Sequence, residues 1–296
     1  MSTSLLTGLC SVATMYLSPQ ITLICPLDGM PLSQQGNSLC CVNKHSFDIA
    51  KQGYVNLLPV QYKKSKQPGD SKAMIDARSR FLNAGYYDRI SQKLNDLVSG
   101  LLLDKSHINI LDAGCGEGFY LDACMRSINN NYPDKGLACL GLDISKPAIV
   151  AAAKRNRQIT WLVGTNKAPP VAEHSIDIVI CMFGFCELAI LHKILKPGGY
   201  VILVDAGTEH LLELRKILYP IIRSSDKQND FRDFELIDNE LINYNIQLNQ
   251  REIADLLLMT PHLYRATKEG KDAAQELEQI QLTVDVLFRV LKAKYL

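Results

Sequence analysis

The sequence predicts an α/β protein with a Rossmann-like, mostly parallel sheet and a small N-terminal module. From about residue 107 onward, apolar strand-like runs alternate with helical stretches, which is typical of parallel strands joined by crossover helices. A glycine-rich turn follows the first of these runs. Ahead of them lies a short, turn-rich region that carries several cysteines and a histidine.

The individual elements are expected where apolar residues run together or alternate. Strands are predicted at residues 108–113, 137–143, 159–163, 176–182 and 200–205, with a late antiparallel strand at 280–290. Ser145 is expected to cap one helix, and Asn249 with Glu252 resembles a capping box at the start of another. A helix at residues 188–195 should end at Lys196-Pro197-Gly198-Gly199, because Pro and Gly do not continue a helix there.

Length and charge limit the class of protein. The 296 residues, 47% of them hydrophobic, are enough for one large α/β domain and a small one. The formal net charge is +1, so contact with a nucleic acid would depend on local basic patches rather than on overall charge. No apolar run is long enough to cross a bilayer, so no membrane association is expected.

The cysteines and the N-terminal segment indicate the compartment. The nine cysteines are odd in number, and Cys139 and Cys181 fall within predicted core strands. This pattern predicts reduced thiols in a cytoplasmic protein rather than a disulfide framework. Residues 1–20 contain no charged residue, whereas a signal peptide begins with a basic region. We interpret residues 1–20 as a tail, or as sequence upstream of an alternative start at Met15.

Further segments follow this tail. Residues 21–60 are interpreted as a zinc-finger-like module, and residues 61–100 as a basic loop followed by a helical connector. Residues 101–296 should then form the large α/β domain.

The glycine-rich turn lies between a predicted strand and a predicted helix. It contains Asp112, Gly114, Gly116, Glu117 and Gly118. Such a turn lets a ligand approach the backbone, although NAD-binding folds use a similar turn, and glycines can also merely close a tight one. Asp143 ends the next strand, where a carboxylate can hold ribose hydroxyls. With the Lys-Pro-Gly-Gly turn, these features resemble class I methyltransferases, which implies that the turn, Asp112 and Asp143 bind S-adenosylmethionine.

Cysteine and histidine side chains cluster in the N-terminal region. Thiolate and imidazole groups suit Zn²⁺, and a structural zinc site takes four ligands. The candidates lie in Cys25-Pro26-Leu27-Asp28, in Cys40-Cys41 and at His45. On spacing alone, these could equally be ordinary residues of a small domain without metal.

Longer strings of residues point to one family. They lie at residues 37–41, 45–48, 53–61, 68–71 and 259–261, with shorter matches within 77–87. On these strings, and over almost its whole length from about Thr22, the sequence resembles the bacterial large-subunit (23S) rRNA guanine-N1 methyltransferases. The resemblance implies methylation of guanine N1 in 23S rRNA, with S-adenosylmethionine, in the bacterial cytoplasm. It leaves a homodimer open.

The family resemblance also bears on the metal. In this family a small N-terminal domain binds zinc through Cys-x-x-Cys followed by Cys-x-x-x-His. Cys25, Cys41 and His45 fall on three of these places, and Asp28 stands where the second cysteine would be. A carboxylate can ligate zinc. Cys40 could instead supply the fourth ligand, or the metal could be lost and the module held by packing. In each case the resemblance implies that the module, residues 21–60, binds RNA.

The resemblance further implies contacts between the cofactor and residues outside the turn. The family's contacts correspond here to Tyr87, Gly116, Glu117 and His210. Without the resemblance, His210 would be interpreted as a solvent-facing helix residue.

Methylation of guanine N1 requires loss of the N1 proton and alignment behind the methyl group. Asp70 is the candidate base. Alternatively, Asp70 is the N-cap of a helix that begins near Lys72. Basic residues nearby are predicted to contact RNA phosphates, although each could belong to a solvated face. They are Lys63, Lys64, Lys66, Arg78 and Arg80.

Two other functions use the same features. A small-molecule methyltransferase with an accessory domain would share the glycine turn. A catalytically silent RNA-binding relative would share the fold, but the intact Asp112, glycine turn and Asp143 argue against it.

Overall fold

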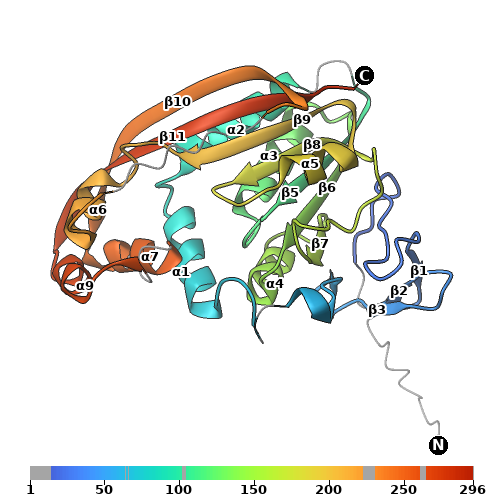
Figure 1. The fold of residues 1–296 in the computed structure, drawn as a ribbon, viewed down its shortest axis with the longest axis horizontal. Helices are drawn as coiled ribbons and strands as arrows, with labels where there is room; N and C mark the ends of the chain where they lie inside the picture. The colour runs from blue at the N-terminus through green and yellow to red at the C-terminus, as the bar shows by residue number, and fades with distance from the viewer. Residues whose placement is uncertain are drawn as a thin grey trace, which may run out of the picture.

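The computed structural model describes residues 15–63, 65, 67–101, 105–222, 231–260 and 265–295. A large sheet forms the centre of this part of the chain, and helices pack against it (Figure 1). A second, three-stranded sheet lies near the N-terminal end of the chain. The predicted α/β fold with a small N-terminal module is therefore confirmed.

The central sheet has eight strands. They are β4 (Tyr54–Asn56), β5 (His107–Ala113), β6 (Gly136–Asp143), β7 (Thr160–Val163), β8 (Ile176–Met182), β9 (Leu195–Ala206), β10 (Phe234–Asn249) and β11 (Gln279–Ala293). Their order is β10-β11-β9-β8-β5-β6-β7-β4, and β11 is antiparallel to both its neighbours while the other pairs are parallel. The order reverses between β5 and β8, which is where open α/β sheets bind ligands, at the carboxyl ends of the strands.

Helices cover both faces of this sheet. They are α1 (Lys72–Asn83), α2 (Asp88–Gly100), α3 (Phe119–Asn131), α4 (Lys146–Arg155), α5 (Leu188–Ile194), α6 (Leu212–Leu218), α7 (Gln250–Met259) and α9 (Lys268–Gln275), with a 3₁₀ turn at Val60–Tyr62. Apolar residues of α2, α3 and α4 join one core cluster, and those of α5 join another with the N-terminal segment. Within the described residues, no helix has both the length and the apolar character to span a membrane.

The predicted helix caps are confirmed. The Ser145 hydroxyl accepts a hydrogen bond from the Ala148 amide at 3.2 Å, at the start of α4. At the start of α7, Asn249 Oδ1 accepts from the Glu252 amide at 3.2 Å, and Glu252 Oε2 accepts from the Asn249 amide at 2.8 Å. Local side-chain chemistry therefore sets where these helices begin.

Three strands of the central sheet depart from the prediction. Strand β9 begins at Leu195, so the Lys-Pro-Gly-Gly segment belongs to the strand instead of preceding it. Strand β10 was not predicted, because most of its side chains are exposed at the edge of the sheet and it lacks an apolar run. Strand β4 was also missed, since three residues carry too little periodicity to identify a strand.

The N-terminal module contains the small antiparallel sheet. Its strands are β1 (Ser33–Gln35), β2 (Ser38–Cys40) and β3 (Ser46–Asp48). Strand β4 follows but pairs with β7, with Val55 opposite Leu162. Residues 54–56, near the end of the predicted module, therefore form an edge strand of the central sheet.

The segment before the module packs against the large domain. Met15 is buried, the Thr160 hydroxyl donates to the Tyr16 carbonyl at 2.8 Å, and Asn109 Nδ2 donates to the Gln20 carbonyl at 3.0 Å. Residues 15–20 of the predicted N-terminal tail therefore pack against the large domain, while residues 1–14 lie outside the described residues.

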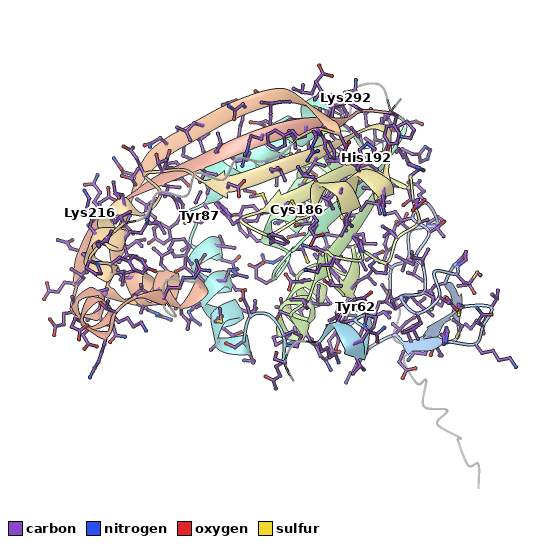
Figure 2. The ribbon with its side chains drawn as sticks, in the orientation of Figure 1. Tyr62, Tyr87, Cys186, His192, Lys216 and Lys292 are labelled. Atoms are coloured by element: carbon purple, nitrogen blue, oxygen red, sulfur yellow. The ribbon has the colours of Figure 1, made fainter. Side chains whose placement is uncertain are left out.

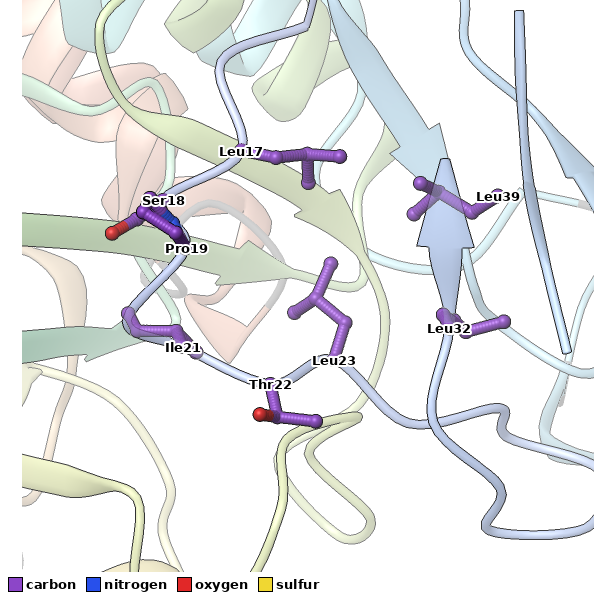
Figure 3. Close-up of a pocket in the computed structure, with 8 residues that line it drawn as sticks. All are labelled: Leu17, Ser18, Pro19, Ile21, Thr22, Leu23, Leu32 and Leu39. Carbon is purple, nitrogen blue, oxygen red and sulfur yellow. The ribbon is translucent and has the colours of Figure 1, made fainter. Parts of the chain in front are cut away.

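A hollow of about 230 Å³ opens beside this segment and contacts Leu32 and Leu39 of the module (Figure 3). It lies toward the amino end of β5, because the neighbouring Gln20 bonds Asn109. The hollow is therefore separate from the ligand-binding edge of the sheet.

Candidate functional site

The glycine-rich turn joins the carboxyl end of β5 to α3. Gly114, Gly116 and Gly118 have φ values of +94°, +55° and +81°, a region that side chains with a Cβ rarely adopt. A Cβ on Gly118 would lie 2.5 Å from the Trp161 ring, so this glycine is required by packing inside the domain. A Cβ on Gly116 would instead point toward the Arg78 guanidinium at 3.2 Å.

Two aspartates surround the turn. Asp143 Oδ2 accepts from the Gly116 amide at 2.9 Å and Oδ1 accepts from the Ser145 amide at 2.8 Å, so this side chain holds the turn in place. Asp112 is buried, and its Oδ1 has no hydrogen-bond partner among the described residues. Burial, with Asp143 and Glu117 nearby, raises the pKa of Asp112 to about 8.

Glu117 is directed away from the open side of the turn. Its Oε1 pairs with the Arg155 guanidinium at 3.0 Å, and its Oε2 accepts from the Phe119 amide at 2.7 Å, at the start of α3. Burial raises the pKa of Glu117, and the positive charge of Arg155 opposes that shift. The Glu117 carboxylate thus accepts a hydrogen bond at the start of the helix and holds Arg155 in place. Glu117 therefore faces the open side of the turn with its backbone.

These residues fit S-adenosylmethionine. The cofactor carries an ammonium, a sulfonium and ribose hydroxyls, and a buried carboxylate oxygen without a partner is suited to a cationic group. Asp112 supplies that oxygen. Asp143 has lone pairs left for hydroxyl groups, since each oxygen accepts one amide. The positive φ values at Gly114 and Gly116 allow a ligand to approach the backbone.

Tyr87 and His210 lie together, although 123 residues separate them in the sequence. The Tyr87 hydroxyl is 3.3 Å from His210 Nε2, and the Asp285 amide donates to His210 Nδ1 at 3.3 Å. An acceptor role for Nδ1 leaves the proton on Nε2, which then donates to Tyr87. His210 precedes α6 in a turn and is half-buried, so the alternative of a solvent-facing helix residue is wrong. Tyr87 lies between α1 and the long strands β9 and β11 (Figure 2).

An aromatic segment at the carboxyl end of β8 was missed by the sequence analysis. Phe183 has φ of +51° and is 39% exposed, and its ring stacks on that of His210 with centroids 6.0 Å apart. Phe185 is 67% exposed, and its carbonyl accepts from Asn166 at 3.2 Å. The available signal was the position of Phe-Gly-Phe directly after a central strand, where open α/β sheets bind their ligands.

Asp70 does not cap the helix. The N-cap of α1 is Ser71, whose hydroxyl accepts from the Met74 amide, so the helix-cap alternative for Asp70 is wrong. Asp70 Oδ2 instead pairs with Arg78 Nη2 at 2.6 Å, and the Asp70 carbonyl accepts from the Ser145 hydroxyl at 2.7 Å. This loop therefore lies against the start of α4, beside the glycine turn.

The predicted RNA-binding residues separate into groups. Arg78 points inward toward the glycine turn, and Arg80 makes two hydrogen bonds to Asp255 of α7, at 2.9 and 2.5 Å. Both arginines are thus occupied by intramolecular partners, which does not favour the predicted phosphate contacts. Lys63 is exposed, whereas Lys64 and Lys66 lie outside the described residues.

The four candidate metal ligands converge. One ligand atom each from Cys25, Asp28, Cys41 and His45 lies within 4.8 Å of the others. His45 Nδ1 is 3.5 Å from Cys25 Sγ, 3.4 Å from Cys41 Sγ and 3.0 Å from Asp28 Oδ2. Two thiols, an imidazole and a carboxylate are a donor set that fits a four-coordinate zinc ion.

The alternative fourth ligand is placed elsewhere. Cys40 Sγ lies 3.5 Å from the Ser46 hydroxyl and is not part of the cluster. Asp28 accepts from Asn43 Nδ2 at 2.9 Å and from the Met30 amide at 3.0 Å, and these bonds hold the pKa of Asp28 well below its usual range. Asp28 is therefore an ionised ligand oriented by its neighbours.

Comparison with known proteins agrees with this arrangement. Residues 23–66 match the zinc-ribbon family described as "RlmA, N-terminal", and residues 111–203 match a methyltransferase domain. The sheet order, the glycine turn and the acid at the end of β6 define a class I methyltransferase that uses S-adenosylmethionine. The predicted fold class and cofactor are confirmed, and the zinc-ribbon match supports the predicted metal.

Relatives that match nearly the whole chain give the family. YxjB of Bacillus subtilis, named as a candidate 23S rRNA (guanine-N(1)-)-methyltransferase, is 30% identical over 88% of this chain and 94% of its own length. A similarly named protein of Micromonospora griseorubida is 31% identical over 81% of this chain and 85% of its own. The 23S rRNA (guanine(748)-N(1))-methyltransferase of Streptomyces fradiae is 25% identical over 91% and 96%. The chain belongs to the family of 23S rRNA (guanine-N(1)-)-methyltransferases.

Proposed function

We propose that this protein transfers a methyl group from S-adenosylmethionine to N1 of a guanine in 23S rRNA, in the bacterial cytoplasm. The observation that carries the proposal is the joint presence of a methyltransferase sheet and a zinc-ribbon module in one chain. Relatives named for this reaction match both parts together.

The reaction needs positioning more than activation. The cofactor, when bound, supplies a methyl group on a sulfonium that is already a good leaving group. The protein must hold guanine N1 in line with that methyl group while the N1 proton leaves. Holding two reactants in alignment supplies a large part of such a rate acceleration, equivalent to about 7–11 kcal/mol in favourable cases.

Several residues are proposed to bind the cofactor. Asp112 and Asp143 provide carboxylates, the turn provides open backbone, and Tyr87 and His210 close the site from the opposite side. The support is their placement around one edge of the sheet. The proposed backbone contacts are at Gly114, Gly116, Glu117 and Gly118.

The acceptor base is proposed to enter beside the carboxyl end of β8. The exposed rings of Phe183 and Phe185 provide flat surfaces there, and base–aromatic stacking is worth about 1–3 kcal/mol per base. Since guanine N1 is engaged in pairing within a duplex, the target nucleotide must be unpaired or extruded. The zinc-ribbon module and Lys63 are proposed to hold the surrounding RNA.

Nucleoside analysis of rRNA tests the proposal. Mass spectrometry of 23S rRNA from a deletion strain should show loss of one N1-methylguanine, and the purified protein with S-adenosylmethionine should restore it on that RNA. A protein with Asp112→Ala provides the matched inactive control. Unchanged N1-methylguanine in the deletion strain, with no methylation of the purified RNA, would refute the assignment.

The small-molecule alternative makes a different prediction for binding. A methyltransferase acting on RNA should bind an rRNA fragment with an affinity that falls steeply with salt, because phosphate contacts release counterions. An enzyme that methylates a small molecule would not show this salt-dependent RNA binding. Gel-shift measurements at two salt concentrations separate the two.

A homodimer is also proposed. The support is β10, which ends the sheet among the described residues and exposes Leu236, Ile237 and Leu241. An unpaired strand with apolar side chains can pair with another copy. Light scattering of the protein and of Leu241→Lys measures the assembly state, and a monomeric native protein would contradict the proposal.

A further inference from the structure

The methionine end of S-adenosylmethionine carries two opposite charges, and the carboxyl groups around the glycine turn suit the positive one. The carboxyl groups of Asp112 and Asp143 suit the ammonium, but they offer no favourable contact to the carboxylate. A bound carboxylate therefore requires a cation or free amide donors close to the turn.

Three amides near the start of α3 are already engaged within the protein. The Gly116 amide donates to Asp143, and the Phe119 amide donates to Glu117 Oε2. The Gly118 amide donates to the Cys115 carbonyl. Two of these three amides are thus held by carboxylates of the protein itself.

Two arginines lie close to the acids of the turn. Arg155 is paired with Glu117 Oε1 at 3.0 Å, and its Nε donates to the Glu117 carbonyl, so it is fixed behind the turn. Arg78 stands on the opposite side. A Cβ built on Gly116 would be 3.2 Å from Arg78 Nη1, so this nitrogen faces the space that the missing side chain leaves open.

The Arg78 side chain is held in that position. Its Nη2 donates to the Met259 carbonyl at 3.2 Å and pairs with Asp70 Oδ2 at 2.6 Å. The side chain is only 23% exposed. These contacts direct the Nη1 edge of the guanidinium toward the turn, and a planar guanidinium is well suited to bind a carboxylate.

We propose that Arg78 binds the carboxylate of S-adenosylmethionine, and that Asp70 positions Arg78 for this contact. The proposal rests on the proposed function, because it concerns the same site. It assigns to Arg78 a role at the cofactor in place of the RNA phosphate contact that the sequence suggested.

Binding of two cofactor analogues tests this assignment. Calorimetry with the full chain would compare S-adenosylmethionine with decarboxylated S-adenosylmethionine, which lacks only the carboxylate. The native protein should prefer the complete cofactor. Arg78→Ala should weaken S-adenosylmethionine binding by about 10- to 100-fold, as expected for a hydrogen-bonded charged contact, and leave the affinity for the analogue nearly unchanged.

Two further variants serve as controls. Lys72→Ala removes a cation from the same helix at a side chain that is 83% exposed, and it should leave both affinities unchanged. Arg78→Lys keeps the positive charge but lacks the planar guanidinium group, and it should retain part of the preference for the complete cofactor. Thermal unfolding of each variant monitors folding.

The outcomes distinguish this inference from the proposed function. If Arg78→Ala weakens both ligands equally, or neither, Arg78 does not bind the carboxylate and the inference fails alone. If Arg78→Ala instead loses rRNA affinity while keeping the preference for the complete cofactor, Arg78 contacts an RNA phosphate and not the cofactor. A native protein that binds neither ligand would overturn the proposed function together with the inference.

Discussion

Two glycines of one turn serve different purposes at the residue scale. Gly116 faces the side where Arg78 stands, whereas Gly118 faces the Trp161 ring. The same substitution at both positions should therefore have different effects, although both glycines have positive φ.

Gly118→Ala should lower stability more than Gly116→Ala. Both variants pay about 1–2 kcal/mol for the left-handed backbone, but at Gly118 the Cβ also collides with Trp161, which adds about 1–3 kcal/mol of overpacking. Gly116→Ala should mainly weaken the binding of S-adenosylmethionine. Denaturant unfolding and calorimetry measure the two effects, and equal losses of stability would contradict this division.

Asp112 predicts a pH dependence of stability. Its pKa is raised to about 8 in the folded protein by burial and by neighbouring acids, against about 3.8 when unfolded. The folded state therefore binds the proton more tightly, and this contribution to stability is lost as pH rises toward 8. Asp112→Asn should flatten the fall in unfolding free energy between about pH 5 and 8, by up to about 1.4 kcal/mol per pH unit. Urea unfolding of both proteins across that pH range measures the effect. If the unfolding free energies of the native protein and of Asp112→Asn change in parallel with pH, the prediction is refuted.

Asp70 is predicted to act on catalysis through its carboxylate, as the base or by holding Arg78. Asp70→Asn should slow the methyl-transfer step and leave RNA affinity nearly intact. Single-turnover rates measured over a range of cofactor concentrations separate the two roles. A rate restored by saturating cofactor favours the positioning role, because the base would be missing at any concentration. An unchanged rate would exclude both.

At the scale of elements, the zinc-ribbon module departs from its family at one ligand. Asp28 supplies a harder donor than cysteine, so the site should hold zinc less tightly than a site with three thiolates. Asp28→Cys should raise zinc affinity and stabilise the module, since each tenfold gain adds about 1.4 kcal/mol when the metal is saturating.

Elemental analysis with a competing chelator measures this effect. Cys40→Ser is the matched control, because Cys40 lies beside Ser46 outside the ligand cluster, and it should leave zinc content unchanged. A native protein without zinc, together with an Asp28→Cys protein that gains none, would show that the cluster is maintained by packing alone.

At the scale of the whole molecule, the module and the methyltransferase domain share a sheet. Strand β4 pairs with β7, and Tyr54, Val55, Leu57 and Leu58 are buried. Because each buried apolar side chain contributes about 1.5–3 kcal/mol, together they approach the stability of a domain, about 5–15 kcal/mol.

Two truncated proteins test this connection. A chain that begins at Lys51 keeps β4 and should bind S-adenosylmethionine with reduced RNA affinity. A chain that begins at Val60 loses β4, uncovers β7 and should lose cofactor binding. Both lack the zinc ligands and the packed residues 15–23, so they differ only in residues 51–59, which include β4 and the buried Leu57 and Leu58. Equal cofactor affinities would show that the methyltransferase domain does not depend on this strand.

The sequence by itself determined the features that depend on neighbouring residues. The alternation of strands and helices, the glycine turn, the cap at Ser145 and the capping box at Asn249 were all predicted, because each depends on chemistry within a few residues. The cysteine and histidine cluster was also visible in the sequence, and the family resemblance identified the four metal ligands that the fold brings together.

Only the tertiary structure decided which distant groups meet. Arg78 could be interpreted as a phosphate contact until the fold placed it against Met259, 181 residues away, and beside the glycine turn. Residues 54–56 carry no periodic pattern, and they became a strand because the edge of β7 offered hydrogen-bond partners. Buried charges and backbone groups take whichever partners the fold supplies, since leaving them unpaired costs more than any local preference.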